Sequence, residues 1–476
     1  MAMTAERMSR VDTAWLRMDN DVNLMMIVGV WRIQPGIAYD ALCARVQDKL
    51  LKYGRFQQKV VEDAMGALWV HDKAFDIQHH VRAEQLTPRR GQAEREALQE
   101  RVGELCTTPL DRTRPLWQLH FIEDYDGGSA LIARIHHCIA DGIALISVLL
   151  SITDGGTEPP ARKKRGKSDA EGDEQADWFA DAIMKPLTDV TIKAIGLTGS
   201  GMAKSVELLA NPQQPLTGTV DMARVGYQVV SDAASMLLMP DDSPTRLKGK
   251  PIGSKRVAWG EPLPLDAVKA IGKGLGCSVN DVLLACVAGA IGSYLRDQGD
   301  DTTGQEIRAM VPVNLRPMEK AYKLGNQFGL VPLVLPIGIV NPIERVYAVR
   351  ARMQELKGSY QPLLAFAVLA VAGLLIKPMQ DALLNLFAKK ATAVMTNVPG
   401  PAVPLKICGS TLSQVMFWVP QSGELGMGVS ILSYGGGVQF GLITDARLCP
   451  DPQEIIQRFE PEFQKLLMVT LMLPWE

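Results

Sequence analysis

The sequence predicts a mixed α/β protein made of two halves in series. The chain has 476 residues, of which 47% are hydrophobic, and domains usually run about 100 to 200 residues, so it is long enough for two separate cores. Short runs typical of β-strands alternate with helical stretches before and after a long charged segment. We therefore expect a first half over residues 1–155, a connection over residues 156–250 and a second half over residues 251–476.

The first half begins its alternation of strands and helices at residue 23. Apolar runs of strand length predict the strands, and longer stretches with helical periodicity predict the helices. The expected strands cover residues 23–33, 67–72, 117–124 and 130–137, and the expected helices cover residues 39–56, 93–110 and 142–153.

The connection begins with a charged stretch. Residues 155–175 contain ten charged residues, in a basic block followed by an acidic one, and only two alanines as apolar content. Such a segment cannot bury enough surface to offset its ordering entropy, so it predicts a flexible surface linker. Its basic block could contact anionic phospholipid or the phosphates of CoA, although a solvated charge run is the favoured interpretation. From Trp178 to about Pro240 the pattern is mostly helical.

The second half repeats the alternation. The expected helices cover residues 265–276, 279–299 and 341–360, and the expected strands cover residues 255–259, 306–315, 328–339, 391–401, 416–421, 426–436 and 438–445. The apolar run 362–376 is shorter than the roughly 18 to 20 residues that span a bilayer. It fits a buried helix, which we favour, or a segment that rests on a lipid surface with Lys377, Lys389 and Lys390 near the headgroups.

Composition excludes several classes of function. The formal net charge of −2 lacks the basic excess that nucleic-acid binding requires. Seven scattered cysteines without a CxxC pair fit neither a disulfide framework nor a zinc site. The first 21 residues have no continuous apolar region, so we expect no secretory signal and a cytoplasmic location.

The segment HHCIADG, residues 136–142, is the candidate for chemistry. A strand of apolar residues ends in two histidines, and Asp141 and Gly142 then form a turn before an apolar helix. Alternate residues of a strand point to opposite faces, and His137 shares its face with Leu131, Ala133 and Ile135. His137 is therefore the expected reactive group and His136 a supporting one. A second pair, His79 and His80, lacks the Asp-Gly partner, and we assign it to structure.

The motif, in order with several others, resembles the bacterial wax ester synthase/acyl-CoA:diacylglycerol acyltransferase family, within the superfamily of CoA-dependent acyltransferases that share HHxxxDG. The matching segments are PLDRTRPLW (109–117), SVNDVLLA (278–285), MVPVNLR (310–316) followed by LGNQFG (324–329), TNVPGP (396–401) and SYGG (433–436). The resemblance implies two chloramphenicol-acetyltransferase-like halves, each a mixed sheet flanked by helices, with the active-site channel between them. It also implies acyl-CoA as a substrate, a long-chain alcohol or diacylglycerol as acceptor, and no cofactor or metal.

The chemistry of acyl transfer suits these residues. A neutral imidazole can take the proton of the attacking hydroxyl, and the imidazolium can then protonate the CoA sulfur that leaves. We therefore expect direct transfer with His137 as general base, and a covalent role for Cys138 is disfavoured because no second base is assigned to it.

The remaining site residues have supporting roles. Asp141 is grouped with the catalytic residues, but we expect it to anchor its loop through an ion pair, as the resemblance implies, and Arg316 is the candidate partner. Gly142 would allow a positive backbone dihedral or a close helix approach. Asn280 opens a helix, either as an ordinary cap or, as the family pattern suggests, as a residue that lines the site.

Two other functions stay open at this point. The enzymatic alternative is a condensation-type domain, which would use the same motif with an amine acceptor. The alternative from another class is a noncatalytic lipid-binding protein with the same fold, against which the intact motif argues. For the expected acyltransferase, the water-insoluble acceptors would require peripheral contact with the inner membrane face or with lipid droplets.

Overall fold

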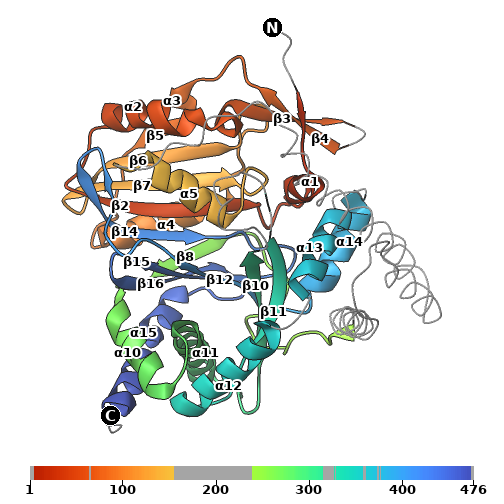
Figure 1. The fold of residues 1–476 in the computed structure, drawn as a ribbon, viewed down its shortest axis with the longest axis vertical. Coiled ribbons are helices and arrows are strands. Elements are labelled where there is room, and N and C mark those ends of the chain that lie inside the picture. Colours follow the sequence, from red (N-terminus) through yellow and green to blue (C-terminus); the bar gives the residue numbers. More distant parts are fainter. Residues whose placement is uncertain are drawn as a thin grey trace, which may run out of the picture.

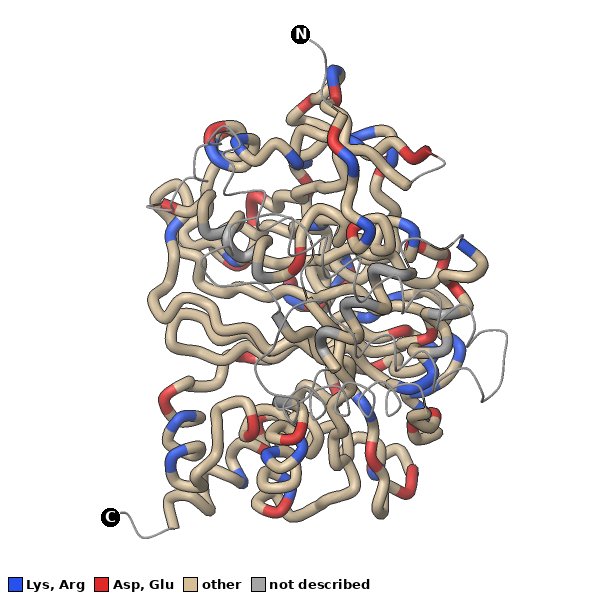
Figure 2. The backbone as a smooth tube through the Cα atoms, turned by 45° about the vertical axis from the view of Figure 1, so that its right-hand side comes forward, with Lys and Arg blue, Asp and Glu red and all other residues tan. Residues whose placement is uncertain are grey.

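The computed structural model of the protein contains two large β-sheets. It describes residues 5–63, 66–154, 238–314, 326, 328–357, 361–372, 375 and 377–472. Figure 1 shows the two sheets as successive layers, with the N-terminal half above and the C-terminal half below. The expected linker and most of the helical crossover lie outside the described residues. Figure 2 shows acidic and basic residues interspersed over both halves rather than gathered by sign.

The first sheet has six strands in the order β13-β14-β2-β7-β6-β5. Its central strand β7 pairs antiparallel with β2 on one side and β6 on the other. The strands of this sheet are β2 (Met26–Gln34), β5 (Val81–Glu84), β6 (Trp117–Tyr125), β7 (Gly128–His136), β13 (Lys406–Ile407) and β14 (Ser410–Trp418). A smaller sheet beside it contains β1 (Glu6–Arg7), β3 (Gln58–Asp63) and β4 (Gly66–His71).

Helices cover both faces of the first sheet. Helices α1 (Arg10–Arg17), α2 (Tyr39–Lys49) and α5 (Gly142–Ile152) contribute to the core on one face. Helix α4 (Glu94–Thr107) covers the other face, and its apolar residues join a cluster that also contains Trp259 and Trp418. The two halves therefore share a core beneath α4. Helix α3 (Ile77–His80) and two short 3₁₀ turns, Leu50–Lys52 and Gly54–Gln57, complete this half.

The second sheet follows the order β11-β10-β12-β15-β16-β8, with β9 paired to β16. Its strands are β8 (Lys255–Trp259), β9 (Leu263–Pro264), β10 (Ile307–Asn314), β11 (Phe328–Leu335), β12 (Ala393–Pro399), β15 (Met427–Tyr434) and β16 (Gly437–Asp445). Its helices are α10 (Leu265–Leu275), α11 (Val279–Asp297), α12 (Pro342–Lys357), α13 (Gln361–Ala372), α14 (Lys377–Ala388) and α15 (Pro452–Leu471).

Helix α11 is the core helix of the second half. It begins with a capping box, in which Ser278 and Asp281 each accept the other's backbone N–H. By length and composition it could cross a membrane, but most of it is buried inside the protein. Helix α13 also has buried residues, Leu364, Ala365 and Leu369 among them, which agrees with the favoured interpretation of the apolar run.

Two strands, β13 and β14, cross the expected division of the chain. Strand β14 belongs to the C-terminal half of the sequence but pairs antiparallel with β2, with Val415 opposite Trp31 and Leu412 opposite Ile33. The first sheet is therefore not contained in residues 1–155. The pairing covers the edge that β2 would otherwise present to solvent. Dividing the chain by sequence position alone could not show that strands of the C-terminal half join the first sheet.

Candidate active site

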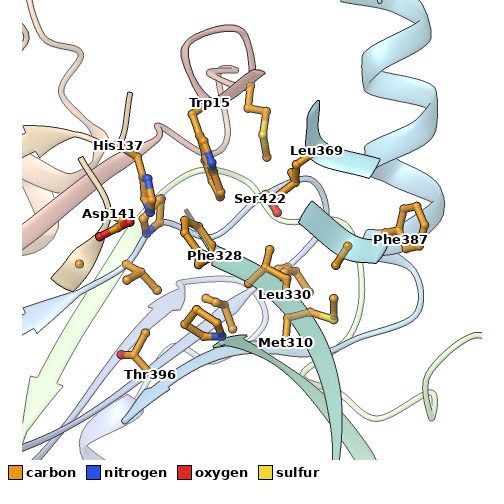
Figure 3. Close-up of a pocket in the computed structure, with 18 of the residues that line it drawn as sticks. Trp15, His137, Asp141, Met310, Phe328, Leu330, Leu369, Phe387, Thr396 and Ser422 are labelled. Atoms are coloured by element: carbon orange, nitrogen blue, oxygen red, sulfur yellow. The ribbon is translucent and has the colours of Figure 1, made fainter. Parts of the chain in front are cut away.

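A cavity of about 540 Å³ lies where the two halves meet. Its wall is formed by α1, the turn after β7, strands β10, β11 and β12, helices α13 and α14, and the loop between β14 and β15. Most of the residues that line it are apolar; polar side chains come from His137, Asp141, Thr396, Asn397 and Ser422. Figure 3 shows His137, Asp141 and Trp15 at one end and Phe387 at the other. A concave apolar site with few polar groups is typical of a ligand pocket.

The end of β7 places His137 on this wall. The strand ends at His136, and the next residue donates its backbone N–H to Met25 O at 2.7 Å before the chain turns toward α5. His137 lines the cavity, and His136 is not among the described residues that do. This placement agrees with the assignment from strand alternation, in which the two side chains point to opposite faces.

Aromatic rings hold the imidazole of His137. The Trp15 ring stacks on it with centroids 4.2 Å apart and an interplanar angle of 14°, and the Phe328 ring lies at 5.4 Å. Burial lowers the pKa of His137 to about 3. The nearby His136 lowers it further, while the backbone carbonyl of His137 and the side chain of Asn326 partly oppose the shift. The imidazole is therefore neutral at physiological pH and can accept a proton.

His136 supports the turn from behind. Its Nδ1 accepts the backbone N–H of Cys138 at 3.1 Å, and its Nε2 lies 3.3 Å from Asp19 Oδ2. Asp19 also accepts from Arg112 and from the backbone of Met25. Burial raises the pKa of Asp19, but its contact with His136 and its other partners outweigh burial and lower the pKa. This ionised group fixes the position of His136.

Asp141 caps the helix that follows the motif. Its Oδ1 accepts the backbone N–H of Ala144 at 2.9 Å, and it lies on the cavity wall. Arg316, its expected ion-pair partner, lies outside the described residues. The structure supports neither expected reason for Gly142, because its φ is not positive and a Cβ added there would meet no atom of the described residues within 4 Å. Gly142 itself lines the cavity.

Asn280 reaches the cavity only through another residue. It is exposed in the first turn of α11, and its Oδ1 accepts from Asn397 Nδ2 at 3.0 Å. Asn397, in the TNVPGP segment, is the residue of this pair that lines the cavity. The helix cap is Ser278 rather than Asn280. Asn280 therefore does not line the cavity itself but hydrogen-bonds to Asn397, which does.

Sequence reasoning missed four residues around His137: Asp12 and Trp15 on α1, Asn326 just before β11, and Phe328 at the start of β11. Asn326 Nδ2 donates to Asp12 Oδ1 and to the backbone carbonyl of His137, both at 2.7 Å. Asn326 and Phe328 belong to the LGNQFG segment, which the sequence analysis matched to the family without giving either residue a role. The helical spacing of apolar residues around Trp15 could have indicated α1.

Cys138 and His80, to which the sequence analysis gave no part in the reaction, are both buried. Cys138 is fully buried, burial raises its thiol pKa well above the usual value, and it is not among the described lining residues. His80 is also buried, with Nδ1 2.8 Å from Trp117 O, and burial lowers its pKa to about 4. Neither arrangement suits a reactive group at the cavity.

Comparison with known proteins covers nearly all of the chain. Residues 8–283 match the wax ester synthase/diacylglycerol acyltransferase catalytic domain, and residues 324–467 match the WS/DGAT C-terminal domain. A probable diacylglycerol O-acyltransferase of Mycobacterium tuberculosis is 27% identical over 477 residues, which cover 97% of this chain and 96% of the relative. A second probable diacylglycerol O-acyltransferase of that organism is 28% identical over 415 residues, covering 84% of this chain and 83% of the relative.

Solved structures show the same fold. The wax ester synthase/diacylglycerol acyltransferase from Marinobacter aquaeolei VT8 superposes with a TM-score of 0.64 at 20% identity, covering 98% of this chain and 100% of that one. The first condensation domain of the calcium-dependent antibiotic synthetase superposes with a TM-score of 0.59 at 13% identity, covering 98% and 97%. The expected mixed α/β architecture, related to that of condensation domains, is confirmed.

Proposed function

Because the chain belongs to the wax ester synthase/diacylglycerol acyltransferase family, we propose that it transfers a fatty acyl group from acyl-CoA to a hydroxyl, that of a long-chain alcohol or of diacylglycerol, with His137 as general base. The observation that supports this most is a neutral imidazole on the wall of an apolar cavity. The apolar wall suits aliphatic chains, and the polar groups at the His137 end suit the reacting atoms.

The proposed reaction is a direct transfer. His137 takes the proton of the acceptor hydroxyl as its oxygen attacks the thioester carbonyl, and a tetrahedral intermediate forms. When this collapses, the C–S bond breaks and the imidazolium returns the proton to the CoA sulfur. The lowered pKa of His137 weakens it as a base but makes its imidazolium a strong acid toward a thiolate, so the second proton transfer is favoured.

Nothing in this scheme requires a cofactor or a metal. Acyl-CoA is a substrate, its thioester is already activated, and the base belongs to the chain. We also propose a cytoplasmic enzyme in peripheral contact with the inner membrane face or with lipid droplets, because neither acceptor dissolves in water. Helices α13 and α14 form one side of the cavity and are the candidate route from such a surface.

The assay that tests this function follows thiol release and ester formation together. Purified protein would receive palmitoyl-CoA with hexadecanol, with dipalmitoylglycerol or with hexadecylamine. We expect stoichiometric thiol and ester with at least one hydroxyl acceptor. Amide formation in preference to ester would indicate condensation-type chemistry, and binding of the lipids without thiol release would indicate a noncatalytic lipid-binding protein.

A further inference from the structure

The main chain of His137 is held from both halves of the protein. Strand β7 ends at His136, and the backbone N–H of His137 still donates to Met25 O of the first half at 2.7 Å. Its carbonyl instead accepts from Asn326 Nδ2 of the second half, also at 2.7 Å. His137 is only 3% exposed, and a buried carbonyl requires a hydrogen-bond partner. Asn326 supplies that partner just past the end of the strand.

Asp12 on α1 orients the amide of Asn326. The Nδ2 group donates to Asp12 Oδ1 at 2.7 Å, and the backbone N–H of Asn326 donates to the same oxygen at 3.1 Å. Burial raises the pKa of Asp12 to about 6, so at neutral pH this carboxylate is ionised and can only accept hydrogen bonds. The carbonyl of His137 is likewise an acceptor only. The amide must therefore present its NH₂ group to both, because the reversed orientation would place its oxygen against two other oxygens.

The amide is not placed to satisfy its own hydrogen bonds. Asn326 and Asp12 are each only 5% exposed, and Asn326 Oδ1 is buried with no hydrogen-bond partner among the residues that the structure describes. A buried acceptor without a partner costs free energy, and an apolar side chain of similar size would avoid that cost. The value of Asn326 at this position therefore lies in its two donors.

Helix α1 and the start of β11 also hold the ring of His137. Trp15 lies three positions after Asp12, on the same side of the helix, and its ring stacks on the imidazole with centroids 4.2 Å apart. Phe328 lies two positions after Asn326, and its ring is 5.4 Å from the imidazole. Figure 3 shows both rings beside His137. The two segments that contact the ring thus also hold the carbonyl of the same residue.

We propose that Asp12 and Asn326 form a clamp that fixes the main chain of His137 on the cavity wall, with Asn326 as a positioning residue and Asp12 as the residue that orients it. The inference rests on the proposed role of His137 as general base. A base must lie within hydrogen-bond reach of the acceptor hydroxyl, and a displacement of about 1 Å can cost on the order of 10²-fold in rate. Because Asn326 belongs to the second half, the clamp also keeps His137 in register with the part of the wall that β10 and β11 form.

The hydrogen bond to the carbonyl of His137 can be observed directly. His137 and Cys138 form the only His-Cys pair in the sequence, so protein with ¹³C-labelled histidine carbonyls and ¹⁵N-labelled cysteine gives a single carbonyl–amide correlation. In Asn326→Ala this carbonyl signal should shift upfield, because the carbonyl loses its donor. We expect kcat to fall at least about tenfold and KM for palmitoyl-CoA to stay within about threefold. An unshifted signal, or a kcat within about threefold of the wild type, would overturn the proposal.

Two variants of Asp12 test the clamp while the Asn326 side chain is retained, even if Asn326→Ala does not fold. Asp12→Ala removes the oxygen that accepts both N–H groups, so the carbonyl signal should shift and kcat should fall. Asp12→Asn keeps an accepting oxygen and should recover most of the kcat and the wild-type signal. If Asp12→Asn behaved like Asp12→Ala, the proposed orientation of Asn326 by Asp12 would be wrong.

Gln380 provides a matched control. It is also a buried amide that holds α1, with Nε2 donating to Ala14 O at 2.9 Å, but it is not among the described lining residues. Gln380→Ala should lower the melting temperature and leave the His137 carbonyl signal and kcat unchanged. If it shifted the signal and lowered kcat as much as Asp12→Ala, the effects would come from a loosened α1, and the clamp would be refuted. Absence of acyl transfer in the wild type would instead count against the proposed function, while the carbonyl signal would still test the clamp.

Discussion

Replacing His137 with glutamine should reduce the acid sensitivity of the fold. Burial lowers the pKa of His137 to about 3, whereas an unfolded histidine titrates near 6.5. Below pH 6.5 the unfolded chain therefore binds a proton that the folded protein does not, and the free energy of unfolding falls as the pH falls. The slope approaches roughly 1.4 kcal/mol per pH unit well below pH 6.5 and is half of that at pH 6.5, so the loss between pH 6.5 and 4.5 is about 2 kcal/mol.

Other groups titrate over the same range but do not obscure the comparison. His80, whose pKa burial lowers to about 4, destabilises the fold in acid for the same reason. Burial raises the pKa of Asp12 to about 6, so that the folded protein binds this proton first and is stabilised as the pH falls from 6 toward 4. Both contributions are present in the wild type and in His137→Gln, and they largely cancel in the difference.

The assay is urea denaturation at pH 6.5, 5.5 and 4.5. His137→Gln should lose less stability than the wild type, by about 2 kcal/mol over the whole interval. His71→Gln is the control, because the His71 side chain is exposed, and it should follow the wild type. Equal pH dependence in the wild type and His137→Gln would show that the folded imidazole protonates normally, which would refute the reasoning that burial keeps it neutral.

Three further predictions concern its neighbours. Trp15→Ala should cost about 3 to 5 kcal/mol of stability and lower kcat, measured by denaturation and initial rates, because it removes the ring stacked on His137; an unchanged kcat would exclude any role in holding the base. Asp141→Asn keeps a good helix cap, so if Asp141 forms the expected buried ion pair with Arg316, the variant should lose roughly 3 to 5 kcal/mol of unfolding free energy. Adding Arg316→Met should then restore part of that stability, whereas strictly additive losses in the double variant would exclude the pair. Cys138→Ala should retain turnover, and mass spectrometry should find no acyl group on Cys138 in the wild type supplied with acyl-CoA alone; a discharged acyl adduct would mean covalent catalysis.

The strands and the histidine that lines the cavity could be predicted because both depend on local pattern. Strand β7 is an apolar run that ends at the motif, and alternation along it separates His136 from His137 without knowledge of the rest of the fold. The helix cap made by Asp141 was not predicted, although it too is local, because Asp141 lies three residues before Ala144. These features require only a few consecutive residues.

The surroundings of His137 could not be predicted, because they come from distant parts of the chain. Asn326 is 189 positions from His137, and the residue that orients it, Asp12, is 314 positions from Asn326. The pairing of β14 with β2 is likewise a tertiary event between segments far apart in the sequence. Asn280 lies near the cavity but does not line it. Asn397, which lies on another element and hydrogen-bonds to Asn280, is the lining residue, and the sequence alone does not show this contact.

The most direct measurement of the central claim is the single-turnover rate of acyl transfer by His137→Gln and the wild type, with palmitoyl-CoA and the better hydroxyl acceptor both saturating. The account predicts ester formation at least about 10²-fold slower in the variant, because a general base typically contributes 10²- to 10⁴-fold. The same variant should still bind acyl-CoA. A variant that keeps more than about a tenth of the wild-type rate would contradict the assignment of His137 as the base.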